Sequence, residues 1–135
     1  MATRTVSNKE LEFVKKWLEN NQDSKSETIT KDLEGIIAKE FQTEKVICTN
    51  SAMGSLHLAL QTIGIGLGDE VIVDPIVVFG GMAAMYQNAV PVFADIDSET
   101  YNIDPKSISE RITPRTKAII CTHHFGNICD MKSIS

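Results

Sequence analysis

The stretch VIVDPIVVFGGMAAMYQNAVPVFADI, residues 71–96, changes its residue pattern twice. Its two ends, residues 71–74 and 90–96, are short apolar runs rich in β-branched residues, whereas residues 80–88 are mostly small and suit a helix. The order strand, helix, strand predicts a βαβ unit whose two strands run parallel. Because the strands are apolar almost throughout, we expect a sheet that is covered on both faces.

The same alternation continues on both sides of this unit. Before it we expect a strand at residues 45–48 and a helix at 52–63. After it we expect a helix that begins at Asp104-Pro105 and a strand at 117–122. Repeated strand–helix units predict an α/β fold of three layers, with a mainly parallel sheet between two layers of helices.

The N-terminal part of the chain has a different pattern. Ser7 and Glu10 form a capping-box pattern ahead of an amphipathic helix at residues 8–20. After a polar loop, Thr30 is expected to cap a second helix. We therefore predict a helical lead-in at residues 1–44.

The remaining residues, 45–135, are predicted to form an incomplete α/β domain. Asp130 has the character of a helix N-cap, and the sequence stops about one turn after it. A single helical turn cannot cover its share of a sheet, so we expect a truncated domain.

The composition is that of an ordinary globular chain, with 42% hydrophobic and 23% charged residues. The formal net charge is −5 with both signs interspersed, so we expect no nucleic-acid or membrane partner. No apolar run approaches the roughly 20 residues that cross a bilayer, and the first ten residues lack the apolar core of a secretory signal. Cys48, Cys121 and Cys129 fit no CxxC spacing, which is typical of reduced thiols in a cytoplasmic protein.

Small residues form the turn at residues 50–55, where the first expected strand leads into its helix. A helix N-terminus carries unpaired N–H groups and a partial positive charge, so this turn could hold a phosphate. In the alternative interpretation Ser51 only caps the helix, and the small residues pack against the sheet. The local pattern by itself favours the cap.

Two further patterns do not predict the sites that they superficially match. The glycines of residues 64–68 follow a helix and precede a strand, which is the reverse of the order in a dinucleotide fingerprint. His123 follows the last expected strand, at the sheet edge where open α/β sheets bind ligands. With Cys121 and Cys129 it matches no familiar zinc spacing, so we expect no metal site and favour packing or substrate contact.

Three segments together resemble the DegT/StrS-type aminotransferases, which are pyridoxal-phosphate enzymes that aminate nucleotide-linked keto-sugars or cyclitols. They are SLHLALQTIGIGLGDEVIV (55–73), VPVFADIDSETYNIDP (90–105) and ERITPRTKAIICTHHFGNICDM (110–131). The resemblance runs from about residue 28 to the last residue. It implies the N-terminal part of a fold-type I pyridoxal-phosphate transferase large domain. It also implies glutamate or glutamine as amino donor, a keto-sugar nucleotide or keto-cyclitol as acceptor, and a homodimer in the complete enzyme.

The resemblance assigns the cofactor phosphate to the small-residue turn. The family has a Ser-Gly-Thr-type turn there, and the matching positions are Ser51, Ala52 and Met53. Alanine keeps the turn small, provided that its backbone needs no positive φ. Methionine lacks the threonine hydroxyl, so one hydrogen bond worth about 1–2 kcal/mol is lost. Ser51 or Ser55 could replace it.

The resemblance also implies an aromatic side chain that stacks on the pyridine ring, shortly after the second strand. The matching position is Val77, Val78 or Phe79, and only Phe79 offers a flat aromatic face. The alternative is that Phe79 is ordinary core. His123 matches the histidine of the family's H-x-x-G motif, which implies a substrate-binding or structural role.

No catalytic residue of the family matches a position in these 135 residues. Transamination needs a lysine that holds the cofactor as a Schiff base and moves the proton, and a carboxylate at the pyridine nitrogen. In the family both follow the H-x-x-G segment, and none of the ten lysines here lies in that motif. We therefore expect the 135-residue chain alone to be inactive. The alternative function is a non-catalytic, stand-alone fragment that binds a phosphate-bearing ligand or a partner chain.

Overall fold

The computed structural model describes residues 6–20 and 27–135 of the chain. The chain divides after Cys48 into two compact units. The domain boundary that the sequence predicts after residue 44 stays a prediction. Within the described ranges no helix is long and apolar enough to cross a membrane.

Among its described residues, the first unit contains two helices, α1 (Asn8–Asn20) and α2 (Glu27–Glu40). One of the two hydrogen bonds of the predicted capping box is present ahead of α1, since the backbone N–H of Ser7 donates to the Glu10 carboxylate at 2.6 Å. The prediction that Thr30 caps the second helix is wrong, since α2 already includes this residue. The polarity of a segment does not distinguish a loop from the first turn of a helix.

The prediction of a strand at residues 45–48 is also wrong, because this segment has no regular secondary structure. A β-prone run forms a strand only where a neighbouring strand takes up its backbone hydrogen bonds. Here the backbone N–H of Cys48 donates to a side chain instead, the carboxylate of Glu34 in α2, at 2.7 Å.

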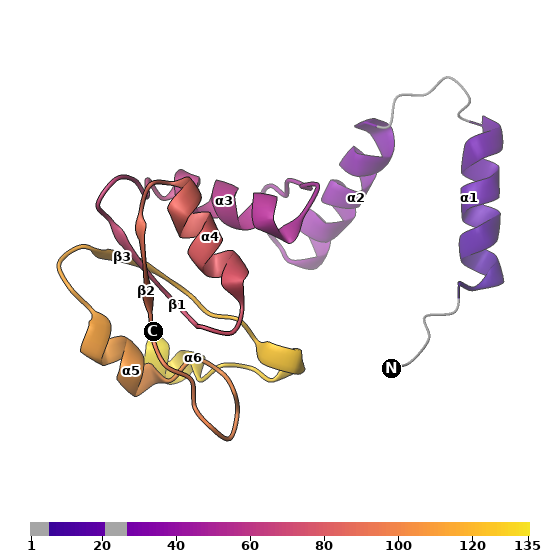
Figure 1. Cartoon of the computed structure of the whole chain (residues 1–135). Helices are drawn as coiled ribbons and strands as arrows, with labels where there is room; N and C mark the ends of the chain where they lie inside the picture. Colours follow the sequence, from indigo (N-terminus) through magenta and orange to yellow (C-terminus); the bar gives the residue numbers. More distant parts are fainter. Residues whose placement is uncertain (1–5, 21–26) are drawn as a thin grey trace. The chain divides into compact units, whose positions relative to one another are not determined.

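The second unit is a three-layer α/β arrangement, as the sequence predicts (Figure 1). In the part of the chain that the structure describes, three parallel strands have the order β2-β1-β3. The elements in chain order are α3 (Ala52–Thr62), β1 (Glu70–Val73), α4 (Val78–Tyr86), β2 (Val90–Phe93), α5 (Pro105–Arg111), β3 (Thr116–Ile120), the 3-10 turn η1 (His124–Gly126) and α6 (Met131–Ile134).

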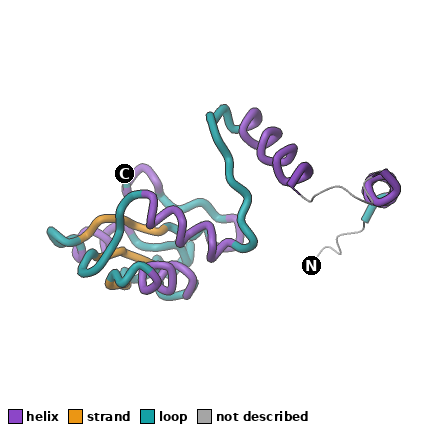
Figure 2. Tube along the Cα trace, turned by 90° about the horizontal axis from the view of Figure 1, so that it is seen from above, coloured by secondary structure: helices purple, strands orange, loops and turns teal. Residues whose placement is uncertain are grey.

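The middle strand β1 joins the two helical layers, because successive side chains of a strand point to opposite faces of the sheet. Val71 and Val73 belong to the core that α3 and α4 cover. Ile72 belongs to the opposite core, with Ile103 and Ile108. All of β1 is buried, so the continuous apolar run in the sequence has the predicted cause. The short strands, orange in Figure 2, lie among the helices of this unit.

Helix α4 lies close to the sheet because its contact face contains glycine. A Cβ atom at Gly80 would come within 3.1 Å of Val73 Cγ1, whereas the nearest atom to one at Gly81 would be Phe93 Cζ at 3.6 Å. Gly80 therefore permits the closest approach between the helix and β1. This packing fixes the first turn of α4, which carries Phe79, at the end of the sheet.

The other end of the sheet is held by Glu70, whose side chain is 6% exposed. Its carboxylate accepts hydrogen bonds from Thr113 Oγ1 at 2.5 Å and from Arg115 Nε at 2.8 Å. The Thr113 hydrogen bond, and then Arg115, hold the pKa of Glu70 below its ordinary value, against the opposing effect of burial.

Replacing Glu70 by glutamine should remove a pH-dependent part of the stability of this unit. A carboxylate whose pKa falls on folding stabilises the fold above its unfolded-state pKa of about 4.3. That stabilisation is lost as the pH drops through the lower, folded-state pKa. We expect the urea midpoint of the unmodified protein to fall more between about pH 6 and about pH 3 than that of Glu70→Gln. Glu110→Gln, at an exposed site, is the control and should behave like the unmodified protein. Equal falls for Glu70→Gln and the unmodified protein would contradict the assignment.

Candidate functional site

A cavity of about 510 Å³ lies at the carboxyl-terminal edge of the sheet, within the second unit. Open α/β sheets bind ligands at this edge, and the volume is within the usual range of about 300–1,000 Å³ for small-molecule sites. Three segments line the cavity: the start of α3, the start of α4 and the end of β3 with the residues that follow it.

A second hollow, of about 470 Å³, lies beside α5 and is lined by three aspartates, Asp97, Asp104 and Asp130. Each aspartate already accepts a hydrogen bond from a backbone N–H two or three residues further along the chain. A surface lined by carboxylates repels a phosphate. The cavity at the sheet edge is therefore the candidate site.

Helix α3 begins at one wall of the cavity. Ser51 is its N-cap, since Ser51 Oγ accepts the N–H of Gly54 at 3.1 Å, which is the role that the local sequence pattern favoured. The first N–H groups of a helix have no partner within the helix. Those of Ala52 and Met53 are of this kind, so they remain available to an anion.

The five residues predicted from the sequence are placed differently with respect to the cavity. Ala52, Phe79 and His123 line it. Ser51 and Met53 do not: the Ser51 hydroxyl is used as the cap, and the Met53 side chain packs against the core that α3 and α4 share. For these two residues the backbone is the part that stays close to the candidate site.

The hydroxyl of Ser55 is better placed than that of Ser51 to contact a ligand in the cavity. Ser55 lines the cavity. Its Oγ lies 2.5 Å from Oγ1 of Thr49, which itself donates to the Ser51 carbonyl at 2.9 Å. Ser55 Oγ also lies 3.4 Å from the Ser51 carbonyl, to which it can donate. The Ser55 hydroxyl can turn its proton from Thr49 or this carbonyl towards an anion.

Phe79 lines the cavity from the first turn of α4 and is 49% exposed. A phenyl ring that is half exposed on a cavity wall can stack on a flat ligand. Of the other two positions considered, Val77 also lines the cavity, and Val78 is exposed and does not line it.

His123 lines the cavity from the residues that follow β3. Its Nδ1 accepts the backbone N–H of Cys129 at 3.2 Å. Because a nitrogen that accepts carries no proton, Nε2 bears the proton of the neutral ring. Nε2–H is then the group of His123 that can donate to a ligand.

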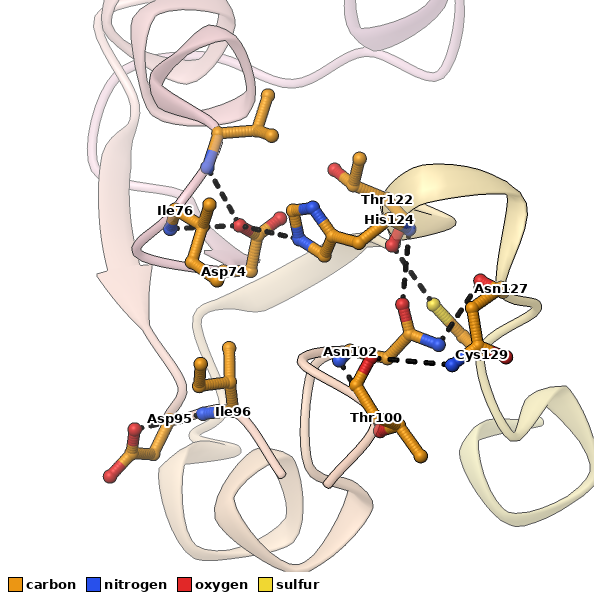
Figure 3. Close-up of polar contacts among 11 residues, drawn as sticks. Asp74, Ile76, Asp95, Ile96, Thr100, Asn102, Thr122, His124, Asn127 and Cys129 are labelled. Carbon is orange, nitrogen blue, oxygen red and sulfur yellow. Dashed lines mark hydrogen bonds and ion pairs between the residues drawn. The ribbon is translucent and has the colours of Figure 1, made fainter. Parts of the chain in front are cut away.

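The structure contains a buried pair that the sequence analysis missed, Asp74 and His124 (Figure 3). Their side chains are 3% and 4% exposed, and His124 Nε2 lies 3.3 Å from Asp74 Oδ1. An aspartate between a strand and a helix is a recognisable capping signal. Nothing in the sequence pairs it with a histidine 50 residues later.

Two thiols, those of Cys121 in the cavity wall and of nearby Cys129, have a pKa above the ordinary value. Burial raises the pKa of Cys121 and of Cys129, and the nearby Asp74 adds to this. Protonated thiols are poor nucleophiles and poor metal ligands. In residues 6–20 and 27–135, no three or more histidine, cysteine, aspartate or glutamate side chains gather as a metal site would need.

The amino-acid sequence shows to which protein family the chain belongs. Residues 4–135 match the DegT/DnrJ/EryC1/StrS aminotransferase family. The chain belongs to this family. Family members use pyridoxal phosphate as cofactor.

Known members of the DegT/DnrJ/EryC1/StrS family share both sequence and fold with the chain. GDP-perosamine synthase from Escherichia coli O157:H7 is 34% identical over 131 residues, which are 96% of the chain and 36% of that protein. L-glutamine:2-deoxy-scyllo-inosose aminotransferase from Streptomyces lividus is 42% identical over 91 residues, 65% of the chain and 22% of that protein. The structure of NtdA from Bacillus subtilis with bound cofactor PMP has a TM-score of 0.84 and 29% identity, over 96% of the chain and 31% of NtdA. The chain spans about a third of the length of the first curated relatives that it matches.

The residues that line the cavity have chemistry that suits the family's cofactor. Pyridoxal phosphate has an anionic end and a flat aromatic ring. The N-terminus of α3 offers unpaired N–H groups on one wall, and Phe79 offers an aromatic face on another. Much of the remaining lining is apolar, as is usual for a cofactor site.

Proposed function

We propose that this chain forms the phosphate-binding and ring-binding walls of the cofactor site in an aminotransferase. The enzyme would transfer an amino group from glutamate or glutamine to a keto-sugar nucleotide or a keto-cyclitol. The observation that carries the proposal is the cavity that brings the α3 N-terminus, Phe79 and His123 together in a chain of this family. The names of the two relatives, one a GDP-sugar synthase and the other a glutamine-dependent cyclitol aminotransferase, support the donor and acceptor classes.

Each of these residues would have a separate task. The N–H groups of Ala52 and Met53 bind and orient the phosphate, and the Ser55 hydroxyl adds a further donor. Phe79 would stack on one face of the ring and exclude water from it. His123 Nε2–H donates to the ligand at the opening of the cavity. The bound pyridine ring supplies an electron sink for amino transfer.

We further propose that the 135-residue chain alone does not catalyse transamination. In the part of the chain that the structure describes, no lysine lines the cavity. Lys106 lies at the acidic hollow beside α5, and Lys117 lies at the beginning of β3, away from the carboxyl-terminal edge. The covalent anchor and the carboxylate at the pyridine nitrogen would then come from polypeptide other than these 135 residues.

Borohydride reduction in the presence of pyridoxal phosphate tests this proposal. We expect no stoichiometric adduct on any one lysine of the 135-residue chain, because none lies at the cavity. The natural gene product should give one adduct, at a lysine outside residues 1–135, and should aminate a keto-sugar nucleotide or keto-cyclitol with glutamate or glutamine. A stoichiometric adduct on one of the ten lysines of the chain would contradict the missing anchor.

The absence of a lysine from the described cavity lining also favours a second function, non-catalytic binding of a phosphate-bearing ligand or of a partner chain. The same experiment separates the two. A natural gene product that binds the cofactor phosphate, forms no adduct and transfers no amino group would support the non-catalytic function and exclude the enzyme.

A further inference from the structure

A buried hydrogen-bond network joins two walls of the cavity (Figure 3). One wall includes Val77 and Phe79, at the beginning of α4, and the other includes His123, after β3. Asp74 Oδ1 accepts the backbone N–H of Val77 at 2.8 Å and also accepts from His124 Nε2 at 3.3 Å. One carboxylate oxygen therefore connects the segment that carries Phe79 with the residue next to His123.

The Asp74–His124 contact acts through its neighbours and not by touching a ligand. Both side chains are almost completely buried, and neither lines the cavity. Asp74 Oδ1 already accepts the backbone N–H groups of Ile76 and Val77, so it is an acceptor here and His124 Nε2 carries the proton of the contact. At 3.3 Å this hydrogen bond is long, but both groups are buried, so its loss would leave a buried polar group without a partner, which is costly.

The network holds His124 from its other side as well. The Oδ1 of buried Asn102 accepts the backbone N–H of His124 at 3.1 Å, and its Nδ2 donates to the carbonyl of Asn127 at 3.1 Å. The turn between them contains Phe125 at φ +55°, a left-handed conformation that a bulky residue rarely adopts. Surrounding contacts must therefore hold this turn in place.

We propose that Asp74 and His124 form a positioning pair, which sets the separation between the Phe79 wall and the His123 wall of the cavity. The inference rests on the proposed function, because this separation matters to a flat ring that lies between the two walls. The pair acts at the ring end of the cavity and not at the phosphate end, where α3 begins. Its removal should therefore weaken ring binding and leave phosphate binding unchanged.

The test compares three probes on the natural gene product. They are 4-deoxypyridoxine 5′-phosphate, 4-deoxypyridoxine and inorganic phosphate; the first two lack the aldehyde and cannot react with lysines. His124→Leu should lower the affinity for both ring-bearing probes by about tenfold and leave the affinity for inorganic phosphate unchanged. His124→Gln, whose amide can still donate to Asp74, should restore most of the lost affinity. If His124→Leu does not fold, Asp74→Asn, which keeps the side-chain size, should show the same selective loss to a smaller degree.

His57→Leu is the matched control, because His57 is hydrogen bonded to Gln87 at 3.1 Å and does not line the cavity. It should leave the affinity for all three probes unchanged. Equal weakening of all three probes by His124→Leu would mean general loosening and would overturn the positioning role. Unchanged affinity of His124→Leu for the ring-bearing probes would also overturn the positioning role. If the unmodified protein binds neither ring-bearing probe, the proposed function fails together with the inference.

Discussion

Substitution of Ala52 by aspartate should abolish the binding of pyridoxal phosphate and leave the second unit folded. Ala52 is the first residue of α3 and lines the cavity. A carboxylate in the first turn of a helix stabilises the helix by about 0.3–1 kcal/mol, so the fold should not suffer. The same carboxylate would face the phosphate across a few ångströms. Two like charges at such a short distance repel each other by several kcal/mol where water is partly excluded. We therefore expect the affinity for pyridoxal phosphate to fall at least about 100-fold.

Equilibrium titration of the natural gene product with pyridoxal phosphate measures this effect. Ala59→Asp is the matched control, since Ala59 is an exposed residue of the same helix that does not line the cavity. It adds the same charge but should keep nearly the full affinity. Equal affinities for Ala52→Asp and Ala59→Asp would show that the phosphate is not held at the N-terminus of α3.

Truncation of Ile72 to alanine should strongly lower the free energy of unfolding of the second unit. Ile72 lies in the middle strand and is 0% exposed, with Ile103 and Ile108 in the same core cluster. Replacing its side chain by a methyl group reduces the apolar area that folding buries. It also leaves a cavity between the layers that the surrounding core cannot fill. Such substitutions cost about 2–5 kcal/mol.

Urea unfolding of the natural gene product, followed by circular dichroism, measures this loss as a shift in the midpoint. Ile63→Ala is the control, because Ile63 is an isoleucine with 62% of its surface exposed, and it should change the stability by no more than about 0.5 kcal/mol. A loss for Ile72→Ala no larger than that of Ile63→Ala would contradict the assignment of β1 as the centre of the core.

The parallel sheet could be predicted because its strands alternate with helices along the chain, and because β1 is apolar on both faces. The residues of β1 show this most clearly, since Val71 and Ile72 lie on opposite faces and are both buried. Whether residues 45–48 form a strand could not be predicted in the same way. Whether a β-prone run pairs depends on a neighbouring strand that is distant in sequence, and local composition carries no such information.

The candidate site could be predicted only where a single segment carries the signal. The local pattern before α3 favoured only a helix cap, and it was the resemblance to the family that assigned Ala52 and Phe79 to a cofactor site; both residues line the cavity. The placement of Met53 is also local, since its spacing to Leu56 already puts it on the apolar face of α3. Asp74 and His124 come together only through the pairing of β1 with β3, so no local pattern could have joined them.

A crystal structure of the natural gene product with pyridoxal phosphate tests the central claim most directly. We predict that the phosphate accepts hydrogen bonds from the backbone N–H groups of Ala52 and Met53, and that the ring lies against Phe79. A cofactor bound elsewhere, or a phosphate that is not in contact with the first turn of α3, would contradict the account.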